Sequence, residues 1–261
     1  KYRQVLKTDS SSVRAAYNLG RAYARTGRYP EAIKQWQRTV TLEPDFADAH
    51  FSLGVAFAQK APTAVDQPAN ISYADLDLAI THLSRAVGLE PRNAAFHHNL
   101  ARALQLRHES AKAAAEYRRA LALDSTMVEA HRFLGEICLE QADLPGAEAA
   151  FAAVVRLDPK DAEGHYQLGK ALERKGAVEQ AVAAYERAVA LRPQYRDAHF
   201  SLAKLYPRLG RSAQAQQAQQ QFEGTEEGED AVEVARRRVQ RLPNSVVERR
   251  ALAVAYAEAG Q

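Results

Sequence analysis

Apolar side chains recur along the chain at the three- and four-residue spacings of amphipathic helices, and no segment is predicted to form a strand. The helical segments are of two kinds. One kind carries a histidine followed three residues later by leucine and a small residue. The other carries alanine and a large residue four positions apart, which places both on one helical face. Copies of the second kind are Ala32 and Trp36, Ala79 and Leu83, Ala113 and Tyr117, Ala147 and Phe151, and Ala181 and Tyr185.

The two kinds of helix alternate with a fixed period. Four histidines that open the first kind are each 34 residues apart, namely His97, His131, His165 and His199. His50 precedes His97 by 47 residues, which is one period plus a 13-residue insertion, and a sixth copy has Ala16 in the histidine position. A fixed period of this length predicts a stacked helical repeat.

Each helix has a recognisable end. The first helices end near a glycine or another short turn residue, at Gly27, His108, Ala142, Gly176 and Gly210. The second helices stop at a proline, which cannot continue a helix. These stops are Pro44, Pro91, Pro159 and Pro193, with Ser125 in the equivalent place.

This pattern resembles the tetratricopeptide repeat family, in which Leu-Gly in the first helix is followed by Ala-x3-Phe and proline. Histidine or alanine replaces the family's tryptophan. The resemblance implies an all-α fold, a right-handed superhelical solenoid of antiparallel helix pairs. The expected units are 13–46, 47–93, 94–127, 128–161, 162–195 and 196–222.

Three segments depart from the period. Residues 1–12 read as the tail of a preceding repeat, and an insertion near 60–72 with two prolines reads as a loop. Residues 223–261 read as an irregular linker, an extra helix and a truncated repeat. We therefore expect a fragment of a longer array whose unpartnered ends, above all Val246 to Ala259, associate with other chains.

The composition of the chain argues against several classes of function. The chain has 261 residues, of which 46% are hydrophobic and 26% charged, and a net charge of +3, which does not favour nucleic acid. The single cysteine excludes an internal disulfide and every multi-cysteine zinc pattern. There is no apolar run long enough to cross a membrane. Nothing in the sequence indicates a compartment.

Catalytic and metal chemistry find little support. Neighbouring helices lie about 8–10 Å apart, whereas zinc–nitrogen bonds measure about 2.1 Å, so the recurring histidines are expected to be structural. Neither a phosphate loop nor a Gly-x-Ser-x-Gly segment occurs. We predict no enzymatic activity, no cofactor and no metal.

The informative positions lie on the first helix of each unit, on the face that the family turns toward its concave groove. One row of this stripe is mostly aromatic and two others are rich in arginine and lysine, with an acidic interruption at Glu129, Glu136 and Glu140. The alternative is that the aromatics pack on the next helix and the charges are solvated surface. The expected groove residues are Arg14, Tyr17, Arg21, Arg25, Phe51, His98, Arg102, Arg132, Glu136, Tyr166, Lys170, Arg174, Phe200, Lys204 and Arg208.

The resulting functional hypothesis is a scaffold that binds a protein or an extended, acidic peptide in this groove, since aromatic and arginine side chains often anchor interfaces. Two alternatives stay open. The array could be the regulatory or substrate-recruiting arm of a larger enzyme, such as a glycosyltransferase, or an assembly protein that stacks end to end.

Overall fold

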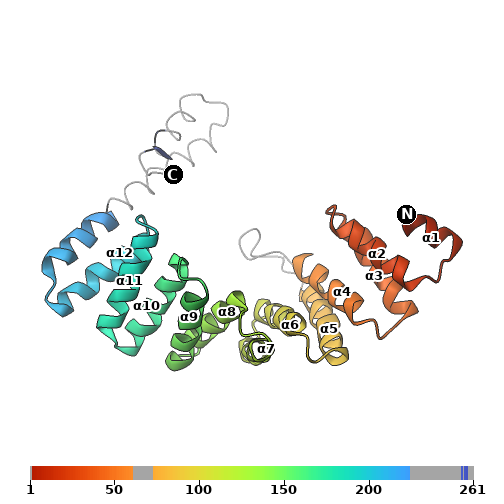
Figure 1. Cartoon of the computed structure of the whole chain (residues 1–261), viewed down its shortest axis with the longest axis horizontal. Coiled ribbons are helices and arrows are strands. Elements are labelled where there is room, and N and C mark those ends of the chain that lie inside the picture. Colours follow the sequence, from red (N-terminus) through yellow and green to blue (C-terminus); the bar gives the residue numbers. More distant parts are fainter. Residues whose placement is uncertain (1, 61–72, 224–253, 255, 258–261) are drawn as a thin grey trace. The chain divides into compact units, whose positions relative to one another are not determined.

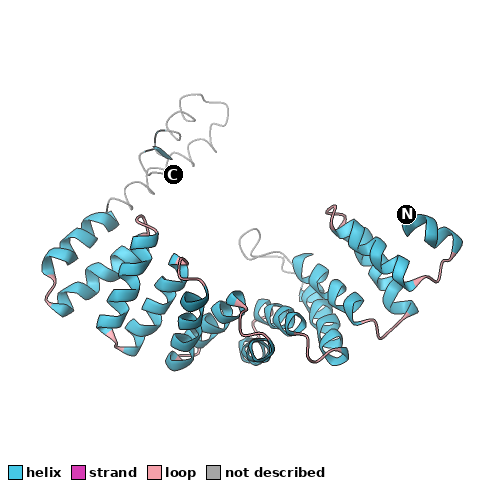
Figure 2. Ribbon diagram, in the orientation of Figure 1, coloured by secondary structure: helices cyan, strands magenta, loops and turns pink. Residues whose placement is uncertain are grey.

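The computed structural model describes residues 2–60, 73–223, 254, 256 and 257 (Figure 1). The chain divides into two compact units, Lys1–Ile137 and Cys138–Gln261, and each is described by itself. Within the described residues every regular element is helical, and Figure 2 shows helices joined by short loops. The expected insertion loop and the linker, extra helix and truncated repeat beyond residue 223 lie almost entirely outside the described residues.

The helices of the first unit follow one another as antiparallel pairs, in which α2 packs on α3, α4 on α5 and α6 on α7. They are α1 (Tyr2–Thr8), α2 (Val13–Ala24), α3 (Tyr29–Leu42), α4 (Ala47–Lys60), α5 (Tyr73–Leu89), α6 (Ala94–Leu106) and α7 (Ser110–Leu123), and α8 (Val128–Glu140) crosses the boundary between the units.

The second unit continues the same alternation, with α10 packed on α9 and α11. Its elements are α9 (Leu144–Leu157), α10 (Ala162–Lys175), α11 (Val178–Leu191), α12 (Arg196–Leu205) and the 3-10 helix η1 (Tyr206–Leu209), followed by helical residues over 212–223, called the glutamine helix below. Helix α12 is shorter than the other first helices because Pro207 has no N–H to extend it, and the chain tightens into η1 instead.

The turns adopt the conformations that the sequence predicts. Gly27, Gly176 and Gly210 have positive φ, and so do His108 at 62° and Ala142 at 59°, which confirms that these five residues occupy one turn position. A left-handed conformation is unusual for residues other than glycine, asparagine and aspartate, so the fold imposes it on His108 and Ala142.

The residues directly before the stops of the second helices have a similar extended conformation. Glu43, Asp158 and Arg192 each precede a proline and have φ between −129° and −137°, as expected for a residue before proline. Asp124 takes the same conformation before Ser125. Its carboxylate accepts hydrogen bonds from the Thr126 amide and hydroxyl, which lower the pKa of Asp124, and this local turn substitutes for proline.

The core lies between the paired helices. The large residues of the second helices are buried, namely Trp36, Tyr117, Phe151 and Tyr185, which confirms that the face they share with alanine is the core face. Glycine makes the close approach possible, because a Cβ on Gly169 would lie 2.6 Å from the Tyr185 ring. The same holds for Gly20 against Trp36.

Candidate functional site

The recurring histidines are explained by a backbone contact. In each of five repeats the histidine Nε2–H donates to the carbonyl six residues earlier, at the stop of the preceding second helix. The pairs are His50 to Pro44 at 2.9 Å, His97 to Pro91 at 3.1 Å, His131 to Ser125 at 3.1 Å, His165 to Pro159 at 3.2 Å and His199 to Pro193 at 2.8 Å. The histidine therefore stabilises the turn between repeats through a hydrogen bond, and the expectation of a structural histidine is confirmed.

The partner of the second ring nitrogen, Nδ1, differs between repeats. Nδ1 of His97 lies 2.6 Å from a carboxylate oxygen of buried Glu116, whereas Nδ1 of His50 lies 3.0 Å from Nδ1 of His82. Within the part of the chain that the structure describes, no group of three or more histidine, cysteine, aspartate or glutamate side chains is arranged to hold a metal ion.

Three expected groove residues, Arg14, Tyr17 and Arg21, lie along one face of α2, and Arg25 follows directly at its C-terminal end. Tyr17 is half-buried, with its ring centroid 5.0 Å from that of Phe46. Burial is the main cause that raises the pKa of Tyr17. The guanidinium of Arg21 lies 5.9 Å from the Tyr17 ring, and both Arg21 and Arg25 are exposed. Arg14, one turn before Tyr17, is exposed as well.

A pocket of about 300 Å³ lies beside this row, between α2, α3 and α4. Arg25 and Phe51 are expected groove residues, and Val55 and Gln59 follow Phe51 at four-residue intervals on α4. The remaining wall comes from both helices of the first pair and from small residues of α4, and it consists of Ala24, Tyr29, Trp36, Ser52 and Ala56. The arrangement combines an apolar floor with an exposed cation at the rim.

His98, in the middle of the stripe, is more deeply buried than Tyr17. His98 is only 7% exposed, because its ring lies against Tyr117 and Phe133, with centroids 5.7 and 6.4 Å away. This burial is the main reason that the pKa of His98 is lowered. The ring is thus a packing element in the described structure rather than an open groove position.

Charged neighbours surround that packed ring. Arg102 is exposed, and its guanidinium lies 6.0 Å from the Phe133 ring. Arg132 and Glu136 on α8 are half-exposed. Phe133 was not among the expected site residues, although it lies directly after Arg132 in the sequence.

In the second unit some of the expected groove residues are packed and others are open, as Tyr166 and Phe200 show. Tyr166 packs against Tyr185 and Tyr195, with centroids 5.6 and 4.9 Å apart, and burial raises its pKa to about 12. Phe200, in contrast, is 51% exposed, although one edge contacts Phe222 of the glutamine helix at a centroid distance of 5.2 Å.

The cations of this patch are partly engaged. Lys170 lies 5.9 Å from the Tyr166 ring, and Arg174 donates to the Leu139 carbonyl at 3.0 Å. Lys204 forms an ion pair with Glu173 at 3.0 Å, while Arg208 is exposed.

None of the described helices combines the length and apolar character of a membrane span.

Comparisons with known proteins identify the repeat. The profile described as TPR repeat matches residues 20–60 and 174–210, and the profile described as Tetratricopeptide repeat matches 74–127 and 100–162. No curated protein sequence matches the chain significantly.

Solved structures share the fold at low sequence identity. YrrB, described as a TPR protein with an unusual peptide-binding site, is 18% identical with a TM-score of 0.65, and the match covers 76% of this chain and 95% of that one. A MamA protein is 19% identical with a TM-score of 0.61, covering 71% and 94% of the two chains. PilF of Pseudomonas aeruginosa is 19% identical with a TM-score of 0.58, covering 96% and 98%.

The period, the turn positions and the profiles agree with the likeness to these structures, which confirms the all-α fold of a TPR solenoid. The chain belongs to the tetratricopeptide repeat family.

Proposed function

We propose that the protein is a scaffold that binds an extended peptide segment along the first-helix stripe of its first unit. The observation that carries this proposal is the pocket between α2, α3 and α4, where Arg25, Phe51, Val55 and Gln59 line a hollow of about 300 Å³. Ligand-binding pockets commonly combine an apolar lining with a few polar groups that fix orientation. A hollow of this size accommodates a large apolar side chain.

The charge beside the pocket favours an acidic partner. Arg14 and Arg21 on α2 and Arg25 directly after it are exposed. The ion pairs among the described residues include none of these three arginines. A peptide that carries aspartate or glutamate next to its apolar residue would supply the missing partners, and such charge matching contributes most to encounter rate and selectivity.

The neighbours support a scaffold rather than an enzyme. YrrB is described as having a peptide-binding site, and proteins of this fold are generally scaffolds without catalytic activity. The peptide chemistry proposed for this chain follows from its own pocket and arginines.

The test is a charge reversal with a matched control. A library of acidic peptides that contain one large aliphatic residue is screened by fluorescence polarisation, and the tightest binder is then measured against Arg25→Glu and Lys34→Glu. Lys34 is exposed on α3, outside the stripe. Replacing attraction by repulsion at an exposed site amounts to about 1–2 kcal/mol, or roughly fivefold to thirtyfold in affinity.

We expect that loss for Arg25→Glu and less than a twofold change for Lys34→Glu. Equal effects of the two variants, or no effect of either, would contradict the proposed site.

A further inference from the structure

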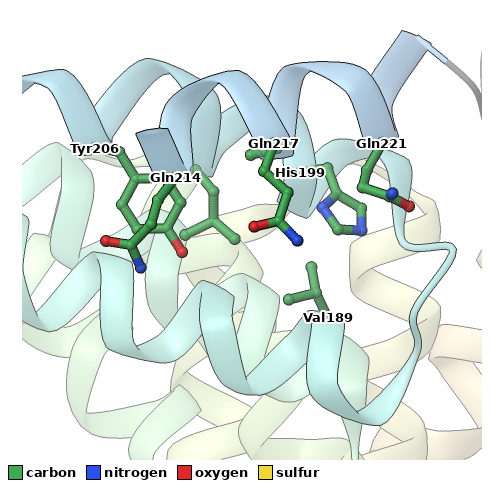
Figure 3. A pocket seen from close by; sticks show the side chains of 8 residues that line it. Val189, His199, Tyr206, Gln214, Gln217 and Gln221 are labelled. Atoms are coloured by element: carbon green, nitrogen blue, oxygen red, sulfur yellow. The ribbon is translucent and has the colours of Figure 1, made fainter. Parts of the chain in front are cut away.

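A second pocket, of about 160 Å³, lies in the second unit between α11, α12, η1 and the glutamine helix (Figure 3). Its floor is apolar, and three glutamines of the glutamine helix project along its edge. The lining consists of Val189, His199, Leu202, Tyr206, Gln214, Gln217, Ala218 and Gln221. These residues are outside the first-helix stripe, so the pocket is independent of the peptide site proposed above.

One nitrogen of a buried histidine remains available in this pocket. His199 is 9% exposed, and its Nε2–H donates to the Pro193 carbonyl at 2.8 Å. That bond fixes the ring, and Nδ1 has no recorded hydrogen-bond partner among the described residues. Figure 3 shows the ring of His199 and the amide of Gln217 turned toward one another.

An earlier repeat shows what this nitrogen can bind. His97 occupies the same repeat position, and its Nδ1 lies 2.6 Å from Oε2 of Glu116, which follows it by 19 residues. The residue 19 positions after His199 is Ala218, which lines the pocket. The hollow therefore lies at the repeat position where Glu116 supplies a carboxylate to His97.

We propose that this pocket binds a carboxyl group carried on a short aliphatic chain, in the position that a glutamate side chain occupies beside His97. The amides of Gln217 and Gln221 provide N–H donors for the second carboxyl oxygen. A volume of about 160 Å³ holds such a group. Both a free carboxylic acid and the glutamate or aspartate side chain of a partner carry this chemistry.

Binding must be linked to a proton. Because Nε2–H of His199 is committed to a carbonyl, a neutral ring presents a lone pair at Nδ1, which repels a carboxylate. The complex needs a proton between Nδ1 and the carboxyl oxygen, so it takes up one proton when it forms from a neutral ring. The affinity for the carboxylate should then fall about tenfold for each pH unit over which the free ring is neutral.

No other titratable group of the lining interferes near neutrality. Tyr206 is buried, which raises its pKa to about 12. Its hydroxyl donates to Glu186 at 3.1 Å, and Arg211 lies 3.3 Å from the same oxygen. These two charges oppose one another behind the tyrosine, and the side chains at the pocket edge are neutral glutamines.

The test is NMR of protein labelled with ¹⁵N in its histidines, titrated at pH 6 and pH 8 with propionate and separately with the capped tripeptide Gly-Glu-Gly. We expect a saturable shift of the His199 Nδ1 resonance that is at least tenfold tighter at pH 6. His131 is the internal control, because the positions equivalent to Gln217, Ala218 and Gln221 in its repeat are all alanine (Ala149, Ala150 and Ala153).

Two variants check the geometry. Ala218→Glu should fill the pocket and abolish the titration, because the chain then supplies its own carboxylate. Gln217→Leu, which leaves the pocket lining apolar, should weaken binding severalfold. A response to propionate and peptide identifies a site open to free acids, and a response to the peptide alone identifies a partner's side chain. No saturable shift with either ligand, or an equal shift of His131, would overturn the proposal.

Discussion

Truncating Phe151 tests the packing of the second helices. Phe151 is 0% exposed, whereas Phe200 in the same unit is 51% exposed on a first helix. A buried phenylalanine removes at least about 150 Å² from water, which corresponds to about 4 kcal/mol at about 25 cal/mol/Å². The methyl group that remains in alanine reduces this figure, and the cavity left behind increases it, so Phe151→Ala should cost about 3–5 kcal/mol.

Phe200→Ala is the matched control, since it removes the same atoms from a half-exposed position that leaves no closed cavity. Its cost should be less than half as large. The assay is urea unfolding followed by circular dichroism at 222 nm. Hydrogen exchange should accompany it, because repeat arrays unfold as neighbouring units rather than in one step. Equal losses for the two variants, or a loss below about 0.5 kcal/mol for Phe151→Ala, would refute the assigned register.

Three further predictions concern stability. Ala142→Gly should raise the melting temperature, because glycine relieves about 1 kcal/mol of left-handed strain at a φ of 59°; a lower melting temperature would show that no strain is stored there. Glu116→Ala should cost about 1–3 kcal/mol in urea unfolding by removing the hydrogen-bond partner of His97 Nδ1, and Glu116→Gln should cost less. Because the pKa values of His98 and His82 are lowered in the fold, these side chains bind protons more readily in the unfolded chain than in the folded one. Their contribution to the free energy of unfolding is therefore complete above about pH 6.5 and is lost at lower pH. The urea midpoint should therefore fall between pH 7.5 and pH 5.5, and by less in His98→Leu.

The helical fold was predictable because its determinants are local and repeated. Proline stops, left-handed turn positions and the alanine-aromatic spacing each act through the backbone or through burial on one face. Repetition makes each signal unambiguous, as with His108 and Ala142, which were identified by period although neither is glycine. The early end of α12 also had a local signal, namely Pro207, which the periodic pattern did not take into account.

The site was predictable only in part. The stripe contains Arg25 and Phe51, which line one hollow, but Trp36 and Tyr29 reach this hollow from the second helix of the pair. His98 is buried because Phe133 of α8 packs on its ring. Such contacts depend on side-chain direction across helices, which spacing along one helix does not determine.

The role of the recurring histidine was likewise only partly predictable from the sequence. Its period indicated a structural role, yet the hydrogen bond to a carbonyl six residues earlier requires the path of the turn. The division into six units and the partner-binding residues remain predictions.

The fluorescence of Trp36 tests the central claim most directly, because Trp36 is the chain's only tryptophan and lines the pocket between α2, α3 and α4. An acidic peptide with one large aliphatic residue should change its emission saturably, with the dissociation constant found by polarisation. Replacing the aliphatic residue by serine, or the peptide's acids by lysine, should abolish the change. Tight binding by polarisation with no change in Trp36 emission, and with unaltered affinity in Arg25→Glu, would contradict the account.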